Sequence, residues 1–214
     1  MNALAFAAIR PERGMPPATG GADTIETRRL LLRRPVEDDI VAMTALANNG
    51  RIAAKLPDMP HPYTIADASR FIRRLRDRES GLTGFAITDR DSGVLIGCGK
   101  LLAGETEGES RIGLWIGEAH WNRGHATEAA QALVDHAFSR SPRLITIRTS
   151  IRTINPAARR MLEKCGFQYA GPGAETDIRT GCLVPVDHYQ IDRGIWAAIK
   201  AWSQSGAGTL RQIA

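Results

Sequence analysis

The sequence predicts an α+β domain in which helices flank a mixed, mainly antiparallel twisted sheet. In the first half, Gly84–Thr88 and Val94–Leu101 are short β-rich runs on either side of the turn-forming segment Asp89–Gly93, the pattern of a hairpin. In the second half, strand-like and helical patterns alternate between Leu114 and Phe167. The mixed sheet follows from this order of elements.

Periodicity and end signals predict the remaining elements. They are the strands Arg28–Arg34, Arg111–Gly117, Leu144–Thr149 and His188–Asp192, and the helices Glu37–Ala47 and Asp67–Arg78, the second preceded by a cap at Thr64. Residues 1–24 are rich in Gly, Pro and Ala without a period, which is typical of a flexible leader. Residues 203–214 read as a loose tail, so residues 25–202 form a single predicted domain.

Composition narrows the class of protein. A chain of 214 residues, 43% hydrophobic and 24% charged, is long enough to bury one proper core. It has no apolar run of membrane-spanning length, and its apolar start lacks the basic residues of a signal peptide. Three cysteines without metal or disulfide spacing fit reduced thiols in a cytoplasm. We therefore expect a cytoplasmic protein without a membrane partner or a metal site.

The net charge of +5 favours an anionic partner. The arginines are dispersed rather than clustered with aromatic residues, so the sequence carries no nucleic-acid footprint. The densest basic run, between Arg70 and Arg78, lies on the polar side of a predicted helix and is interpreted as a solvated face.

The turn Trp121–Ala126 carries the strongest functional signal. It ends the strand Leu114–Ile116 and begins a helix whose apolar residues recur at helical spacing, namely Ala126, Ala129, Ala130, Leu133, Val134, Ala137 and Phe138. The unpaired N–H groups of the turn and the positive end of the helix face one point, and that geometry binds phosphate. Gly124 leaves room for a ligand, Thr127 supplies a hydroxyl and Arg123 a charge. An ordinary strand-to-helix turn remains the alternative.

A second helix is predicted between Asn155 and Cys165. Asn155 suits the N-cap, Pro156 the first helical position, and Gly166 the residue just past the end. Taken alone, Asn155 is therefore a cap.

Together, these two elements, at this separation and followed by Phe167, resemble the acetyl-CoA-binding core of the GNAT superfamily of N-acetyltransferases. The likeness is closest to the RimJ/RimL-like branch, which includes ribosomal-protein N-terminal acetyltransferases. Other segments look like that branch in order, namely TRRLLLRRPVEDDIVAMTAL, KLPDMPHPYTIADASRFI, GFAITDRDSGVLIGCGKL and DHYQIDRGIW. The resemblance covers Ile25 to Ala198. The motif W-x-R-G-x-A-T-E-A is specific in this context, although the superfamily's usual Gln or Arg at its first position is Trp121 here.

The resemblance implies acetyl-CoA as co-substrate and no metal. It implies that two central strands splay apart at Trp115–Ile116 and Thr149–Ser150, so that the pantetheine arm pairs with the N–H and C=O of Ile116. The expected cofactor-binding residues are Trp115, Ile116, Trp121, Asn122, Arg123, Gly124, His125, Ala126, Thr127, Asn155 and Arg159. Of these, Trp121 to Thr127 would hold the pyrophosphate and Asn155 would reach the pantetheine.

The implied chemistry is direct attack of a neutral amine on the thioester carbonyl. It needs proximity, a base for the ammonium proton, and a proton for the leaving thiolate. Aligned on Asn155 and Gly166, the serine of RimL-type enzymes is replaced by Ala158, and the tyrosine of many other members by Leu162. Neither residue can donate a proton, so another group or water does it, or acetyl transfer to an amine is not the task of this protein.

Two glutamates are the catalytic candidates. Glu175 falls near a glutamate that RimL-type proteins use, and Glu118 lies beside the cofactor turn. A solvated loop acid is the alternative interpretation of Glu175. Glu109, His120 and His125 are the rival bases.

The sequence thus predicts an acetyl-CoA-dependent N-acetyltransferase that forms a ternary complex, without a covalent enzyme intermediate. Cys98 is a poor acyl carrier because it lies in an apolar strand without a nearby histidine in the sequence. The second hypothesis, motivated by Ala158 and Leu162, is a CoA-binding module that has lost catalysis.

The acceptor side is expected to be built by the variable segments Asn48–Tyr63 and Gly171–Pro185. A protein N-terminus, a polyamine, an amino acid and an aminoglycoside all remain open as acceptors. The protein is expected to be a monomer or a homodimer.

Overall fold

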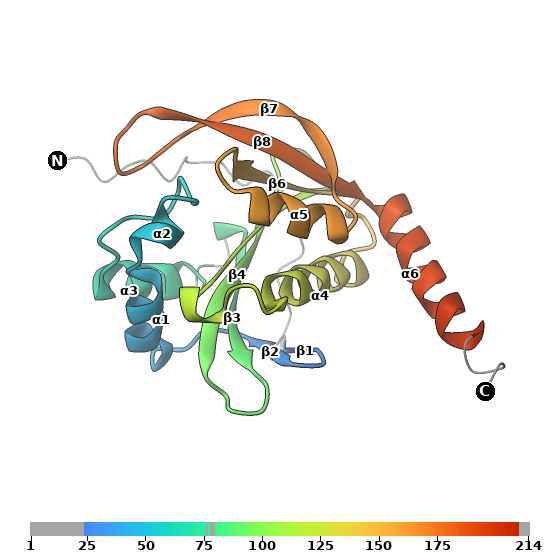
Figure 1. Ribbon diagram of the computed structural model, residues 1–214, viewed down its shortest axis with the longest axis horizontal. Helices are drawn as coiled ribbons and strands as arrows, with labels where there is room; N and C mark the ends of the chain where they lie inside the picture. Colours follow the sequence, from blue (N-terminus) through green and yellow to red (C-terminus); the bar gives the residue numbers. More distant parts are fainter. Residues whose placement is uncertain (1–23, 76, 78–79, 210–214) are drawn as a thin grey trace.

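The computed structural model describes residues 24–75, 77 and 80–209, and its centre is one sheet of eight strands (Figure 1). In chain order the strands are β1 (Ile25–Glu26), β2 (Leu30–Arg33), β3 (Leu82–Asp89), β4 (Leu95–Ala103), β5 (Glu109–Ile116), β6 (Thr146–Arg152), β7 (Gln168–Thr176) and β8 (Leu183–Asp192). Their spatial order is β1-β2-β3-β4-β5-β6-β8-β7. Every neighbouring pair is antiparallel except β5 and β6, which run parallel. The predicted mixed, mainly antiparallel sheet is confirmed.

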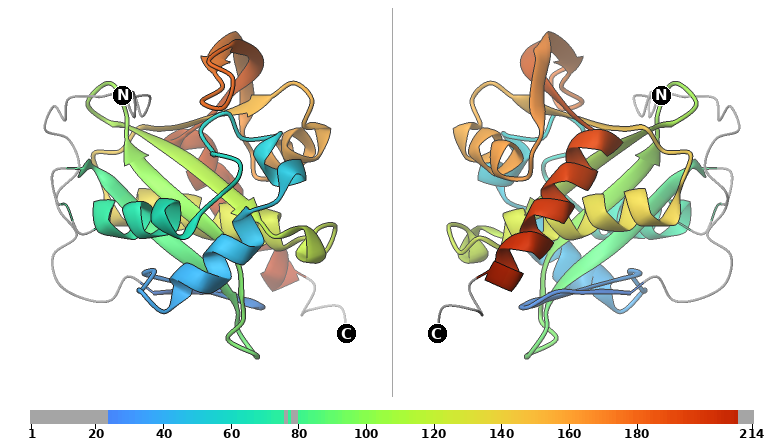
Figure 2. Two further views of the ribbon diagram at one scale, coloured as in Figure 1. Left: turned by 90° about the vertical axis from the view of Figure 1, so that its left-hand side faces the viewer. Right: turned by 90° about the vertical axis from the view of Figure 1, so that its right-hand side faces the viewer.

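Helices cover both faces of this sheet (Figure 2). They are α1 (Asp39–Ala47), α2 (Gly50–Ala53), α3 (Ile65–Arg74), α4 (His125–Arg140), α5 (Pro156–Lys164) and α6 (Arg193–Thr209). The side chains of α1, α2 and α3 form one core with the face that includes Ala86 and Cys98. On the opposite face, α4 buries Leu133 and Phe138 against the sheet, and α6 stacks Trp196 on Phe138 with ring centroids 5.2 Å apart. Alternation of side chains along each strand supplies both cores.

The predicted helices are present, with small shifts at their ends. The helix predicted from Asp67 begins at Ile65, because Thr64 is its N-cap and forms a reciprocal capping box with Asp67. The helix predicted from Glu37 begins at Asp39, whose carboxylate forms a bidentate ion pair with Arg33. Neither α2 nor α6 was predicted, and the four residues of α2 are too few for a periodic signal.

The largest correction concerns β7. Gly171–Pro185 was expected to be a variable loop, but Gln168–Thr176 is a strand that pairs with β8 along nearly its whole length. The side chains of β7 are exposed or half-buried throughout, so its sequence lacks the alternation that reveals a strand. Its glycines and proline reinforced the expectation of a loop. Residue 175 therefore has a fixed position on the sheet.

Only part of each predicted terminal segment falls on residues that the structure describes. The predicted leader lies almost wholly outside the described residues, as do residues 210–214 of the predicted tail. Residues 203–209 were predicted to belong to a loose tail, but they are the last residues of α6. No helix in the described part of the chain has the length and apolar character needed to span a membrane.

Candidate functional site

The parallel strands β5 and β6 separate after a short contact. They pair only from Glu109 and Thr146 to Arg111 and Arg148, whereas β5 stays paired with β4 as far as Ile116. Main-chain groups of successive residues point to opposite edges of a strand. Because Gly117 donates its N–H to Ile96 of β4, the main-chain groups of Ile116 face the other edge, which β6 has left. The predicted opening between the two central strands is confirmed.

The turn beyond β5 has the conformation expected of an anion-binding loop. Asn122 and Gly124 both have positive φ, 60° and 79°, and α4 begins at the next residue, His125. Gly124 is the N-cap and gives α4 no side-chain cap, so the first N–H groups of the helix receive no partner from the cap residue. Such N–H groups and the positive end of the helix suit a phosphate.

A cavity of about 500 Å³ lies between this turn, β5, α2 and α5. Its positively charged side chains come from both walls: Arg51 and Lys55 from α2 and the residues after it, and Arg160 and Lys164 from α5. No Asp or Glu is among the described residues that line it. A cavity with this charge selects a polyanion such as a phosphorylated cofactor.

Most of the predicted cofactor residues line this cavity. They are Trp115, Ile116, Trp121, Asn122, Gly124, His125, Ala126, Thr127 and Asn155. Arg123 and Arg159 are not among the lining residues; Arg159 instead forms an ion pair with Glu163 at 3.1 Å. Arg160 and Lys164 were missed, although Ala157, Arg160, Met161 and Lys164 share one helical face that excludes Arg159. That spacing was the signal in the sequence.

Asn155 acts as the cap that its sequence position predicted. Its side-chain oxygen accepts a hydrogen bond from the N–H of Ala158 at 3.3 Å. Asn155 also lines the cavity. Ala158 lines the cavity as well, whereas Leu162 is buried in the core. The two positions that lack a hydroxyl therefore differ, and only Ala158 faces the space that a ligand could occupy.

Trp121 holds the carbonyl of Ile116. Its indole N–H donates to that oxygen at 2.6 Å, and Lys55 lies 4.0 Å from the ring centroid on the aromatic face. The carbonyl expected to pair with pantetheine thus already accepts one hydrogen bond. Trp121 links the end of β5 to the cationic wall contributed by α2.

His125 is a buried residue whose Nδ1 has no hydrogen-bond partner among the described residues. Desolvation lowers its pKa, and the nearby charges of Arg29 and His120 lower it further. The imidazole is therefore neutral near pH 7 and available as a hydrogen-bonding group in the cavity.

The structure separates the two candidate glutamates. Glu118 accepts a hydrogen bond from Asn49 Nδ2 at 2.8 Å and forms an ion pair with Arg51, so both of its oxygens hold α2 against the turn. Glu175 lies on β7, accepts the hydroxyl of Ser150 on β6, and is 3.4 Å from Arg111 Nη2 on β5. Glu175 thus stands at the junction where β5 and β6 part.

The rival groups are less well placed for proton transfer or acyl transfer. Glu109 forms an ion pair with Arg148 at 2.8 Å. Burial raises the pKa of the thiols of Cys98 and Cys165 to about 12, so both are protonated near pH 7. The hydroxyl of Tyr189, which also carries a proton, is buried on the core side of the sheet and has no hydrogen-bond partner among the described residues.

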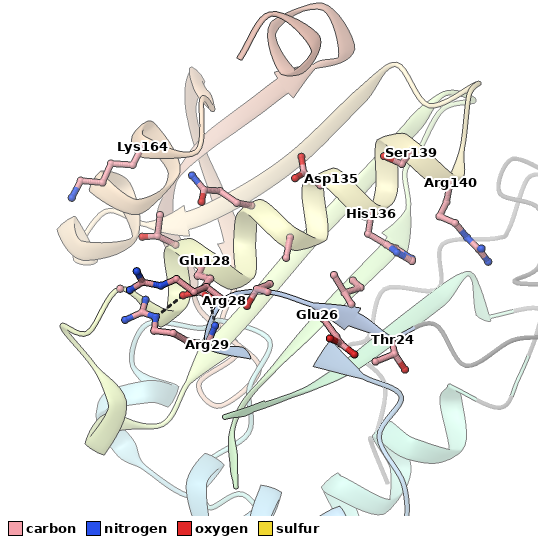
Figure 3. Close-up of a pocket in the computed structure, with 16 residues that line it drawn as sticks. Thr24, Glu26, Arg28, Arg29, Glu128, Asp135, His136, Ser139, Arg140 and Lys164 are labelled. Carbon is pink, nitrogen blue, oxygen red and sulfur yellow. Dashed lines mark hydrogen bonds and ion pairs between the residues drawn. The ribbon is translucent and has the colours of Figure 1, made fainter. Parts of the chain in front are cut away.

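A second, larger groove of about 910 Å³ follows the outer side of α4 (Figure 3). It is lined by Thr24–Arg29 and by residues of α4, among them the acidic side chains Glu128 and Asp135. Glu128 is held by Arg29 at 2.7 Å and by Thr27. Side chains of both charges line this groove. The smaller cavity, in which all the charged lining side chains are cationic, is therefore the better site for a polyanion.

Comparison with known proteins agrees with the geometry. Residues 29–168 match the family described as "Acetyltransferase (GNAT) domain". The chain belongs to the GNAT acetyltransferase family. It is an acetyltransferase, and it is 30% identical over 171 residues to an uncharacterized N-acetyltransferase of Bacillus subtilis strain 168, YoaA, in a match covering 78% of this chain and 95% of the relative.

Solved GNAT structures share the fold. RimJ of Mycobacterium smegmatis, in complex with a CoA disulfide, superposes with a TM-score of 0.72 at 19% identity, over 85% of this chain and 95% of that chain. RimL, a ribosomal L7/L12 α-N-protein acetyltransferase in complex with coenzyme A, has a TM-score of 0.68 at 20% identity, over 79% of this chain and 98% of that chain. The predicted likeness to RimJ and RimL is confirmed for the fold of this acetyltransferase.

Proposed function

We propose that this acetyltransferase binds acetyl-CoA in the cavity beside the Trp121–Ala126 turn and transfers the acetyl group directly to a primary amine in a ternary complex. One observation carries the proposal: a cavity with four cationic side chains and no described carboxylate leads to the open edge of β5. The N–H groups at the start of α4 suit the pyrophosphate, and the edge of β5 suits the amide groups of pantetheine.

In this mechanism Glu175 is the base. The amine enters from the side of the sheet that carries Ser150 and Glu175, loses its ammonium proton to the carboxylate, and forms a C–N bond with the acetyl carbon while the C–S bond breaks. The proximity of the two substrates supplies much of the rate. Ser150 and Arg111, which contact the carboxylate, orient it.

As the C–N bond forms, the nitrogen loses its second proton, and the departing thiolate takes this proton directly or through water. Ala158 is the cavity residue at the usual serine position, and it has no hydroxyl. A thiol pKa of about 8.5 makes protonation by solvent adequate near neutral pH. Restoring a hydroxyl with Ala158→Ser is therefore expected to raise turnover or to leave it unchanged.

The missing hydroxyls also favour one alternative, a CoA-binding protein of the same fold that has lost catalysis. Two measurements separate the proposals. Calorimetry with CoA tests the cavity, and release of free thiol from acetyl-CoA with a panel of primary amines tests transfer. CoA binding with amine-dependent thiol release supports the enzyme, binding without release supports the alternative, and absence of CoA binding refutes both.

A further inference from the structure

The face of the sheet opposite α4 carries a chain of paired charges beside the opening between β5 and β6. Lys100 of β4 forms an ion pair with Asp58, and Arg111 of β5 lies 3.4 Å from Glu175 of β7. The side chain of Lys100 crosses β5 at Gly113. A Cβ at that position would lie only 2.9 Å from Lys100 Cε, so the glycine leaves room for the lysine. Two cations and two carboxylates therefore meet on one face and balance.

The two pairs are close enough to interact. Desolvation tends to raise the pKa of Asp58, but the charge and the hydrogen bond of Lys100 lower it overall, and the charge of Arg111 makes a smaller contribution in the same direction. The segment carrying Asp58 is fixed across the face, because Ile178 N–H donates to Pro57 O at 3.0 Å. The charges are consequently held in place before any acceptor arrives.

Arg111 belongs to the longer of the two ion pairs in this group. Its pair with Glu175 is long, and its side chain is 39% exposed. It is also the last residue of β5 that pairs with β6, so its guanidinium stands where the opening begins. A guanidinium has five N–H donors in a planar fork that matches a carboxylate.

Charge balance then decides the class of acceptor. A polyamine or aminoglycoside brings several positive charges, and both carboxylates of this group already have cationic partners. A zwitterion adds no net charge, because its ammonium group can approach Glu175 while its carboxylate takes the donors of Arg111. Building on the proposed function, we propose that the acceptor is a free α-amino acid whose carboxylate is bound by Arg111.

The experiment compares each of the twenty common α-amino acids with its α-amide as acceptor, alongside spermidine and an aminoglycoside. At least one amino acid is expected to have a kcat/KM about 30-fold or more above that of its amide. The amine of an amide is less basic, so more of it is neutral near pH 7 and intrinsic reactivity favours the amide. A preference for the acid must therefore come from the protein.

Arg111→Met is expected to abolish this preference while leaving CoA affinity unchanged, and Arg111→Lys to retain part of it. Arg148→Met is the matched control. Arg148 of β6 is the register partner of Arg111, but its guanidinium forms an ion pair with Glu109. Circular dichroism checks the fold of each variant. Binding of amino acid and amide to the CoA-loaded protein, measured by calorimetry, gives a second readout that does not depend on turnover.

Equal use or equal binding of acid and amide would overturn the inference, as would loss of the preference in Arg148→Met but not in Arg111→Met. Transfer to spermidine or the aminoglycoside without transfer to any amino acid would overturn it while leaving the proposed acetyl transfer intact. Failure of CoA itself to bind would instead refute the proposed function.

Discussion

The two sides of the β5–β6 opening are built from different parts of the chain. The cofactor side, where CoA is proposed to bind, uses the main chain of one contiguous turn, Trp121–Gly124, together with cations from α2, the residues after it and α5. Of these cations, Arg51 is paired with Glu118, which does not line the cavity. The acceptor side, where the amine is proposed to enter, uses side chains from β4, β5, β6, β7 and the loop after α2, and their charges are paired. The main-chain N–H groups that suit a phosphate come from one local element, whereas positioning a proton acceptor requires groups from several strands.

This contrast explains why the two sides should respond differently to mutation. On the cofactor side, each cation contributes to a shared field, so a single loss is partly compensated by the others. On the acceptor side, each group has a separate role, and its removal leaves a specific partner without a counter-charge. Substitutions on each side of the opening therefore test this difference.

Glu175→Gln should remove the proposed base on the acceptor side. Turnover is expected to fall about 10²–10⁴-fold, because general base catalysis contributes on that scale, while CoA affinity stays unchanged. Part of the loss should be recovered at high pH, where more of the amine is already neutral. Glu118→Gln is the control, since Glu118 contacts Asn49 and Arg51, and it should keep most of the turnover. Full activity in Glu175→Gln would remove Glu175 from the mechanism.

Gly124→Trp should damage the cofactor side through the main chain. A bulky side chain at the turn is expected to weaken CoA binding by up to about 100-fold, since overfilling a packed site costs about 1–3 kcal/mol. Gly93→Trp is a matched control: Gly93 has a φ of 71°, close to the 79° of Gly124, but open space around it. Both variants carry similar backbone strain, so only a loss of affinity confined to Gly124→Trp supports the site. Calorimetry and circular dichroism measure the two effects.

Arg160→Met and Arg159→Met form an adjacent pair that tests the shared field. Arg160 lines the cavity and Arg159 does not, so only Arg160→Met should weaken CoA binding, by about fivefold, a typical contribution of one exposed charge. The difference should shrink in about 1 M salt, where charges are screened within about 3 Å. Equal effects in the two variants would show that the lining of the cavity is misassigned.

The smallest effect is expected for the cysteines. A Cys98→Ala, Cys165→Ala, Cys182→Ala variant should keep most of its activity, because the proposed transfer is direct and desolvation raises the pKa of the two buried thiols to about 12. Mass spectrometry of the wild-type protein with acetyl-CoA provides the opposing test. An acetyl-cysteine that disappears when acceptor is added would establish a covalent intermediate.

The sequence by itself predicted the turn and the α5 wall of the cavity that we propose for CoA, but not the wall formed by α2, which carries Arg51 and Lys55. The strand, the glycine turn and the apolar face of α4 are consecutive in the chain, and the N-cap, proline and glycine of α5 mark its ends locally. Such elements depend on interactions between near neighbours, so their residues could be assigned before the fold was known. Arg160 and Lys164 belong to the same class, since helical spacing from Ala157 places them on the cavity face.

Only the tertiary structure decided the acceptor side. Glu175 was expected on a loop, yet β7 pairs with β8 and brings its carboxylate to Ser150, 25 residues away in sequence, and to Arg111, 64 residues away. The registers of β5, β6, β8 and β7 bring these three side chains together, and no local sequence pattern encodes the register between distant strands. The charge pairs that favour a zwitterionic acceptor became visible only once the sheet had placed them on one face.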